Sequence, residues 1–215
     1  MHVLQPEICQ PLTPADFKVQ TETYAADEER AEQKLFRNFR AEKERFGRCE
    51  FYGCVFENCK FNGCSFERHE YTNAVFKACD FSNGYFRNSY FKQCAFLSCK
   101  WMGADLSESF FKELQVNENN FSYANLNGGK IQNANFLECD FSYADIAMCK
   151  LKSVAVGKCD FTRVNFYNTL LKGVDLSDSV LNGIELSENL SELKGAEINA
   201  VQAADLIKNF GIRVK

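Results

Sequence analysis

The sequence predicts a solenoid, a repeat protein in which every fifth side chain enters one continuous core. From Phe51 to Leu186, twenty-eight consecutive positions at intervals of five hold a large apolar residue, without a slip. Neither the 3.6-residue period of a helix nor the two-residue alternation of a strand produces this spacing. A fixed internal period is the signature of repeat architectures. We call these positions the large column.

A second column of small residues lies two positions before each member of the large column. It holds mainly Cys and Ala, with Ser, Thr, Val and Gly elsewhere. Of the eleven cysteines, all but Cys9 lie in it: Cys49, Cys54, Cys59, Cys64, Cys79, Cys94, Cys99, Cys139, Cys149 and Cys159. The large and small columns together predict two inward-facing positions in each five-residue unit.

Several units have one recurring form: ADLSE (104–108), ANLNG (124–128), ANFLE (134–138) and ADIAM (144–148). These units resemble the pentapeptide repeat family, and the resemblance covers 49–188 without an insertion. It implies an all-β solenoid, a right-handed quadrilateral β-helix in which four units form the four sides of one coil. Twenty-eight units then make seven coils, a rod of roughly 34 Å at the ~4.8 Å spacing of paired strands.

The evenly spaced Cys49, Cys54, Cys59 and Cys64 could belong to a metal site, a disulfide framework or a core of small residues. In the implied fold they lie on four different sides of a coil, so they do not converge as metal ligands do. Cysteines twenty residues apart stack within reach of a disulfide by Cα distance, but in-register stacking gives poor geometry for one. We expect free thiols that act as small buried side chains.

The ends of the chain depart from the repeat. We expect 1–35 to be irregular or partly helical, and 36–190 to form the β-helix, since Phe36 and Phe46 are in register with the large column. The segment 191–215 predicts a capping or dimerisation helix over 200–210, with Asn199 as its N-cap and Gly211 as its stop. Its apolar stripe has helical spacing: Ala203, Leu206, Ile207 and Phe210.

Charge is distributed unevenly over the four predicted sides. One side, the acidic face, carries units 104–108, 124–128, 144–148, 164–168 and 184–188, without Lys or Arg. Its acidic residues are Asp105, Glu108, Asp145, Glu185 and Glu188. The next side, the lysine face, carries Lys92, Lys112, Lys130, Lys150, Lys152 and Lys172. Either pattern can arise on any solvated surface, and the acidic face can also present a negative stripe to a cationic groove.

Composition excludes several classes of function. The net charge of −4 argues against a direct nucleic-acid binder. No run of residues is long and apolar enough for a membrane span, and no export signal begins the chain, so we expect a cytoplasmic protein with reduced thiols. With only two histidines and no phosphate-binding or nucleophile motif, we expect no enzyme activity, no catalytic, cofactor-binding or metal-binding residue, and no cofactor.

Within the family, the C-terminal segment LKGAEINAVQAADLIKNFGI resembles the Qnr and MfpA quinolone-resistance branch. That resemblance implies a homodimer through helix 200–210 and a rod that mimics DNA. It also implies binding to DNA gyrase or topoisomerase IV through the acidic face, with protection from quinolones. The alternative is a structural or adaptor rod that binds other proteins and has no action on topoisomerases.

Overall fold

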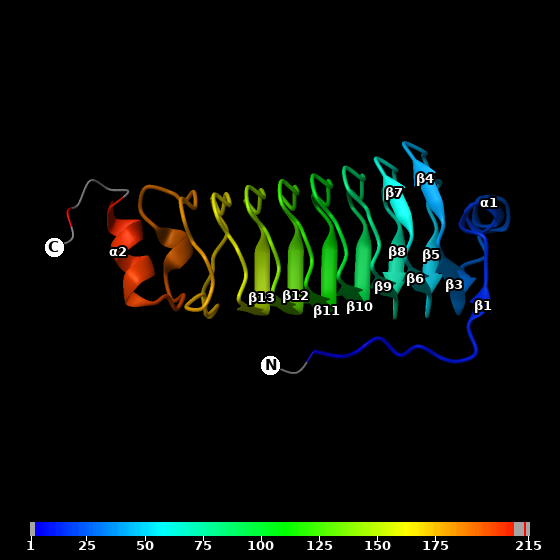
Figure 1. The fold of residues 1–215 in the computed structure, drawn as a ribbon, viewed down its shortest axis with the longest axis horizontal. Helices are drawn as coiled ribbons and strands as arrows, with labels where there is room; N and C mark the ends of the chain where they lie inside the picture. The colour runs from blue at the N-terminus through cyan, green and yellow to red at the C-terminus, as the bar shows by residue number, and fades with distance from the viewer. Residues whose placement is uncertain (1–2, 209–212, 214–215) are drawn as a thin grey trace.

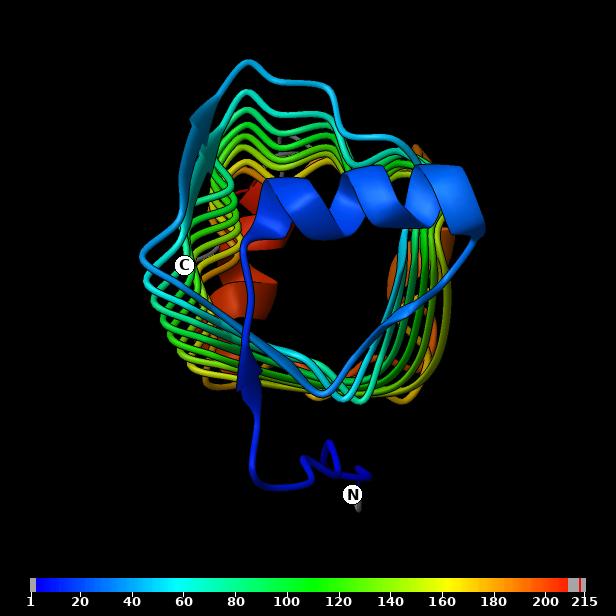
Figure 2. The same ribbon diagram turned by 90° about the vertical axis from the view of Figure 1, so that its right-hand side faces the viewer.

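The computed structural model describes residues 3–208 and 213. The chain forms a right-handed quadrilateral β-helix of about seven turns with a helix at each end (Figure 1), which confirms the predicted fold class. Seen along the axis, the coils superimpose as a four-sided tube (Figure 2). Residues five apart therefore lie on successive sides of one coil, and residues twenty apart lie on the same side of successive coils.

The strands are short at the N-terminal end and longer from residue 90 onward. Strands β10 to β13 each run over two sides of a coil and include the corner between them. The other two sides of those coils are turns, joined to their neighbours by single bridges such as Asp105↔Asn125. The bounds are β1 Thr13–Pro14, β2 Ala31–Glu32, β3 Lys34–Arg37, β4 Arg40–Glu42, β5 Glu50–Tyr52, β6 Val55–Glu57, β7 Lys60–Asn62, β8 Glu70–Thr72, β9 Val75–Lys77, β10 Tyr90–Leu97, β11 Phe110–Asn117, β12 Lys130–Leu137 and β13 Lys150–Gly157.

Neighbouring coils pair in parallel with a register of twenty residues. Phe91 lies beside Phe111, and Ile131 beside Leu151. The row of strands runs β1-β3-β6-β9-β10-β11-β12-β13, and β4 pairs with β7 in a separate two-stranded sheet. This pairing satisfies the backbone of each coil with the coils on either side.

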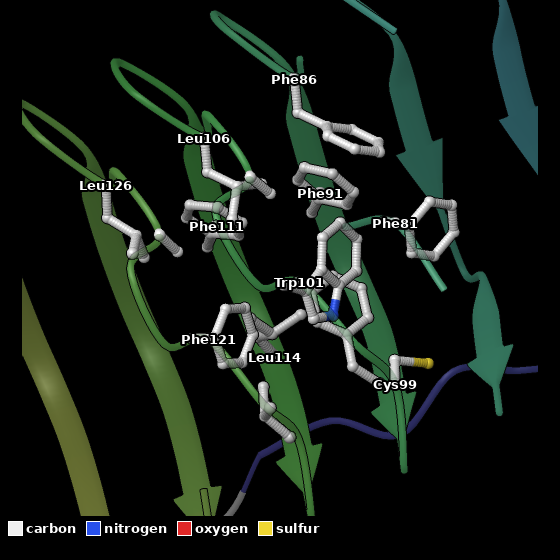
Figure 3. Close-up of a cluster of buried hydrophobic side chains, with 14 of the residues drawn as sticks. Phe81, Phe86, Phe91, Cys99, Trp101, Leu106, Phe111, Leu114, Phe121 and Leu126 are labelled. Atoms are coloured by element: carbon white, nitrogen blue, oxygen red, sulfur yellow. The ribbon is translucent and has the colours of Figure 1, made fainter. Parts of the chain in front are cut away.

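The large column fills the interior with stacked rings. Figure 3 shows Trp101, Phe81 and Phe121 stacked one above another from successive coils. Their ring centroids are 4.4 Å apart for Phe81–Trp101 and 5.9 Å for Trp101–Phe121. All eleven cysteines are free, and all except Cys9 are buried, as the small column predicts.

The N-terminal end of the solenoid is closed by helix α1 (Phe17–Asp27). Asp16 caps it by accepting hydrogen bonds from the backbone N–H groups of Lys18 and Val19. The helix lies across the end of the tube (Figure 2), and Phe17 enters the core, with its ring centroid 4.9 Å from those of Phe46 and Phe61. Phe17 thus covers a coil edge that is otherwise open.

The segment before α1 runs back along the outside of the rod (Figure 1). Val3 is buried, and the backbone N–H of Leu4 donates to Oε2 of Glu113, 3.1 Å away. The coils begin at Ala31, which pairs with Phe51.

The C-terminal end is closed by a 3₁₀ turn (Ser191–Leu193) and helix α2 (Ala200–Lys208). The side chain of Asn199 caps α2 by accepting from the N–H groups of Val201 and Gln202, as predicted. Gln202 donates through Nε2 to the carbonyl oxygens of Leu176 and Ser179. These bonds tie α2 to the last coil. No helix among residues 3–208 is long and apolar enough to cross a membrane.

Candidate functional site

The acidic face is built on a ladder of stacked Asp and Asn side chains. Each of its units places one residue immediately before the inward large residue, and these residues bridge from coil to coil in the order Asp105, Asn125, Asp145, Asn165, Glu185. The turns on this side hold them in line. The predicted residues Asp105, Asp145 and Glu185 therefore lie in one row along the rod.

Two of these carboxylates accept hydrogen bonds from neighbouring residues of the ladder. Oδ1 of Asp105 accepts from the N–H and hydroxyl of Ser107, and from Nδ2 of Asn125. Oδ1 of Asp145 accepts from Nδ2 of Asn165, and its Oδ2 accepts from Nδ2 of Asn127. Asp105 and Asp145 are half-buried and hold neighbouring coils together, so part of their hydrogen-bonding capacity is used.

Glu108, Glu185 and Glu188 carry the accessible charge of the face. All three are exposed, and no hydrogen bond or ion pair engages their side chains within the part of the chain that the structure describes. Their carboxylates are open to solvent.

The same side of the solenoid changes sign toward the N-terminus. Its first three units, 44–48, 64–68 and 84–88, carry four exposed arginines, Arg45, Arg48, Arg68 and Arg87, against two glutamates, Glu44 and Glu67. Arg48 pairs with Glu70 at 2.6 Å, and Nε of Arg87 lies 3.8 Å from Oδ2 of Asp105. The negative stripe is therefore confined to the C-terminal part of this side, from Glu108 onward.

An aromatic ridge, Tyr123, Tyr143 and Arg163, borders the acidic face at the preceding corner. The rings of Tyr123 and Tyr143 stack with centroids 5.0 Å apart, and the Arg163 guanidinium lies 5.8 Å from the Tyr143 centroid. Tyr123 is 61% exposed and Tyr143 45%. Exposed Tyr and Arg are frequent energetic centres of protein interfaces. Sequence reasoning missed this ridge, although the twenty-residue spacing of its three members was visible.

The lysine face, like the acidic face, holds its side chains in rows that run from coil to coil. Lys130 and Lys150 lie side by side in the β12–β13 register, and Gln132 pairs with Lys152. Within residues 3–208, none of the lysines of this face forms an ion pair: Lys92, Lys112, Lys130, Lys150, Lys152 and Lys172. The face has one acidic side chain among these coils, Glu113, which is buried and bonded to Leu4 and Asn133.

The predicted dimerisation residues differ in how far their side chains are exposed. Leu206 is buried in the chain's own core because α2 docks on the last coil. Ala203 is partly buried and Ile207 is 40% exposed. Val201, which the sequence analysis did not select, is 71% exposed. Phe210 and Gly211 lie outside the described residues.

The thiols of the small column have the properties of core side chains. Burial raises the pKa of the Cys94 thiol to about 12, and that of Cys149 to about 11. A thiol with so high a pKa carries little thiolate at neutral pH and is a poor nucleophile. Within the described ranges, no three His, Cys, Asp or Glu residues gather as metal ligands do.

Comparison with known proteins supports the repeat and the fold. The pentapeptide repeats family matches eight copies in this chain, over residues 120–154 and 159–187. No curated protein matches the chain.

Among solved structures, a trypsin-treated variant of QnrB1, a plasmid-mediated fluoroquinolone resistance protein, is 22% identical. It matches over 94% of this chain and 96% of its own, with a TM-score of 0.51. A second trypsin-treated QnrB1 variant is 19% identical over 84% of this chain and all of its own, with a TM-score of 0.48. HetL, from the cyanobacterium Nostoc sp. strain PCC 7120, is a pentapeptide repeat protein involved in the regulation of heterocyst differentiation. It is 13% identical over 82% of this chain and 92% of its own, with a TM-score of 0.39.

The continuous five-residue period, the four-sided coils and the matched repeats lead to one conclusion: residues 120–154 and 159–187 match the pentapeptide repeats family, and the fold of the chain resembles that of a QnrB1 variant.

Proposed function

We propose that this protein mimics DNA without catalysing a reaction, and that it binds DNA gyrase or topoisomerase IV through the acidic face and protects the enzyme from quinolones. The observation that carries the proposal is the set of free carboxylates in the first and last units of that face. Glu108, Glu185 and Glu188 project from a rigid ladder, and units 104–108 to 184–188 contribute no Lys or Arg to the same side.

Type II topoisomerases bind the DNA backbone, so a partner of this class offers a cationic groove. Complementary charge raises the rate of encounter and sets the orientation of the two surfaces more than it adds raw affinity. The rigid coils hold the charges in place before binding, which lowers the entropy lost on association. The aromatic ridge beside the face supplies apolar contact area that charge alone lacks.

A second candidate function is that of an adaptor rod without action on topoisomerases. The observation that favours it is the lysine face, whose six lysines form no ion pair with any carboxylate in residues 3–208. On this candidate the rod places an acidic partner along its length, and the acidic face is a solvated surface.

The two candidates differ in which charge reversals weaken binding. We expect immobilised gyrase to bind the protein with an affinity that falls as salt rises. A Glu185→Lys, Glu188→Lys double variant should bind at least ~10-fold more weakly, because both changes place repulsive charge against the cationic groove.

The matched control is Lys152→Glu with Lys172→Glu, which alters the neighbouring face by the same number of charges and should bind as the parent does. Loss of gyrase binding in the lysine variant alone would show that gyrase binds the lysine face and not the acidic face. No detectable binding of the parent would leave the adaptor candidate.

A further inference from the structure

On the two sides of the solenoid that carry the long strands, the backbone ladder stops after β13. At one corner of each coil, a backbone N–H donates to a carbonyl of the next coil: Ser98 to Asn117, Glu118 to Leu137, and Glu138 to Gly157. The series ends there. Within residues 3–208, no backbone hydrogen bond joins 150–158 to 170–178.

The interruption is bounded on both sides by contacts that persist. The N–H of Cys149 donates to Oγ1 of Thr169 at 2.8 Å, and the N–H of Val180 donates to the carbonyl of Cys159 at 2.9 Å. Segment 170–178 is bonded instead to the part of the chain that follows the last coil, where the N–H of Leu171 donates to the carbonyl of Glu192 at 2.8 Å. The gap is therefore a slot in one part of the wall of an otherwise continuous rod.

A change in backbone conformation accounts for the slot. In the coils before it, these two sides form the eight-residue strands β10 to β13, whereas 170–178 forms turns. Gly173, at the corner of this segment, has a φ of +77°, and a Cβ placed there would meet no atom within 4 Å. On the other sides of the rod, turns pair with turns, but here the strand β13 faces turns, whose N–H and C=O groups do not match the intervals of a strand. Strand β13 (Figure 1) is therefore the last of its row and has one free edge.

The slot opens onto the apolar core. Leu151, Val154 and Val156 of β13 are partly exposed, whereas their counterparts one coil earlier, Ile131, Ala134 and Phe136, are buried. A cavity of about 40 Å³ lies behind them with an entirely apolar lining, and its other wall is formed by Leu171, Val174 and Leu176.

The charges at the slot are positive at one end. Lys130, Lys150, Lys152 and Lys172 are exposed beside the first half of β13, and none has a carboxylate partner among the described side chains. At the other end Lys158 pairs with Glu138 at 3.1 Å, and Asp178 lies near Gly157. A ligand for the slot needs negative charge at one end only.

We propose that the free edge of β13 binds an extended peptide segment of a partner protein as an additional parallel strand. A free edge of this length is a template for strand addition, in which main-chain bonds give affinity and side-chain pockets give specificity. The segment carries apolar residues at the positions that face the cavity. It carries Asp or Glu at the outward positions of its N-terminal half, beside Lys150 and Lys152. Residues 170–178 move outward to admit it.

The chain's own C-terminal tail is a weaker match for this slot. Phe210, Ile212 and Val214 have the apolar alternation of a strand, but Arg213 and Lys215 would bring positive charge to the lysines at its entrance. Like charges placed side by side on neighbouring strands are destabilising. Charge complementarity therefore favours an acidic partner segment over the tail.

The test uses a fluorescent peptide, Glu-Val-Glu-Gly-Val-Thr-Val-Thr, which follows the inward and outward pattern of β13 with Gly at the corner. We expect salt-sensitive binding to the full-length protein by fluorescence anisotropy. The Lys150→Glu, Lys152→Glu variant should bind at least ~10-fold more weakly. The control variant Lys92→Glu with Lys112→Glu changes the same face where the coils are paired, and should bind within about twofold of the parent.

Hydrogen exchange locates the site. In the free protein, the amides of 151–158 should exchange faster than those of 131–138, and the peptide should slow them. Equal protection of the two segments in the free protein would show that the edge is closed and overturn the proposal. Equal binding of a peptide with Lys in place of both Glu would also overturn it, as would peptide binding seen only after removal of residues 209–215, which would make the tail the occupant.

Discussion

At the scale of single residues, His69 is the buried side chain least well matched to its surroundings. It occupies the small column in the row that holds Ser89 and Ser109 in the next two coils. Each of those serines donates to a carbonyl of the preceding coil, Phe66 for Ser89 and Phe86 for Ser109. His69 is fully buried, and among the described residues neither of its ring nitrogens has a hydrogen-bond partner. Burial lowers its pKa from 6.5 to about 4.

This depressed pKa predicts a pH-dependent loss of stability. Above pH 6.5 the imidazole is neutral in both states and has no effect. Between pH 6.5 and 4 the unfolded chain takes up a proton that the folded chain refuses, so the free energy of unfolding falls as pH falls, by up to about 3 kcal/mol for this group.

The measurement is urea unfolding of the parent and of His69→Ser from pH 8 to pH 4. The difference in unfolding free energy between the two proteins should be constant above pH 6.5 and shift in favour of the variant below it. A difference that stays constant over the whole range would contradict the buried, neutral state of His69.

The sequence reveals which residues point inward, because inward positions must be apolar or small at a fixed period. It does not reveal how outward residues are used. Asp105 and Asp145 are predicted as partner-binding charges, yet the ladder with Asn125 and Asn165 takes part of their bonding capacity. The twenty-residue alternation of Asp and Asn was present in the sequence, but its meaning depends on side-chain distances that a period does not give.

At the scale of elements, the core is a set of ring stacks that run from coil to coil. Phe141 is buried between Phe121 and Phe161, with ring centroids 4.9 and 5.4 Å away and planes within 12° of parallel. One inward residue therefore supports three coils.

The Phe141→Ala variant should lose about 3–5 kcal/mol of unfolding free energy, because the removed ring leaves a cavity that rigid coils cannot close. Tyr143→Ala is the matched control. It also removes a stacked ring from the same coil, but from the surface, and should cost about 1 kcal/mol or less. Thermal or urea unfolding compares the two. A Phe141→Ala protein as stable as the parent would show that the large column does not form the core.

Some elements could not be predicted because they do not follow the period. Phe17, at the start of α1, is outside the register, so only the structure shows that it closes the first coil. The free edge of β13 could not be predicted because the five-residue period does not change there. The period continues through Leu171 and Leu176, and an unbroken inward pattern says nothing about whether neighbouring backbones are paired.

At the scale of the whole molecule, α2 both closes the rod and offers a contact surface. Leu206 is directed into the core, whereas Val201 and Ile207 remain exposed on the outside of the helix. We propose that two copies associate through this outer surface of α2, as the resemblance to the Qnr and MfpA branch implies.

Light scattering should then give about twice the 24.6 kDa of one chain. A Val201→Glu, Ile207→Glu variant should scatter as a single chain with an unchanged melting temperature, because both side chains are exposed. Leu206→Ala should instead lower the unfolding free energy by about 2–3 kcal/mol, since Leu206 packs in its own core. A parent protein that scatters as one chain at micromolar concentration would refute the dimer.

The rod as a whole divides its charge by side and by end. The acidic face supplies free carboxylates at the C-terminal end, while arginines occupy the same side at the other end. A partner guided by charge would therefore bind nearer to α2 than to α1. The twenty-residue period predicted the division by side, whereas the arginines at the N-terminal end of the same side were not selected from the sequence.

The most direct test of the central claim is a gyrase supercoiling assay with a fluoroquinolone at an inhibitory concentration, titrated with this protein. We expect supercoiling to recover in the presence of the parent. The Glu185→Lys, Glu188→Lys variant should remove the recovery, and the Lys152→Glu, Lys172→Glu variant should retain it. Supercoiling that stays inhibited at every concentration of the folded parent would contradict the claim that the acidic face protects a topoisomerase.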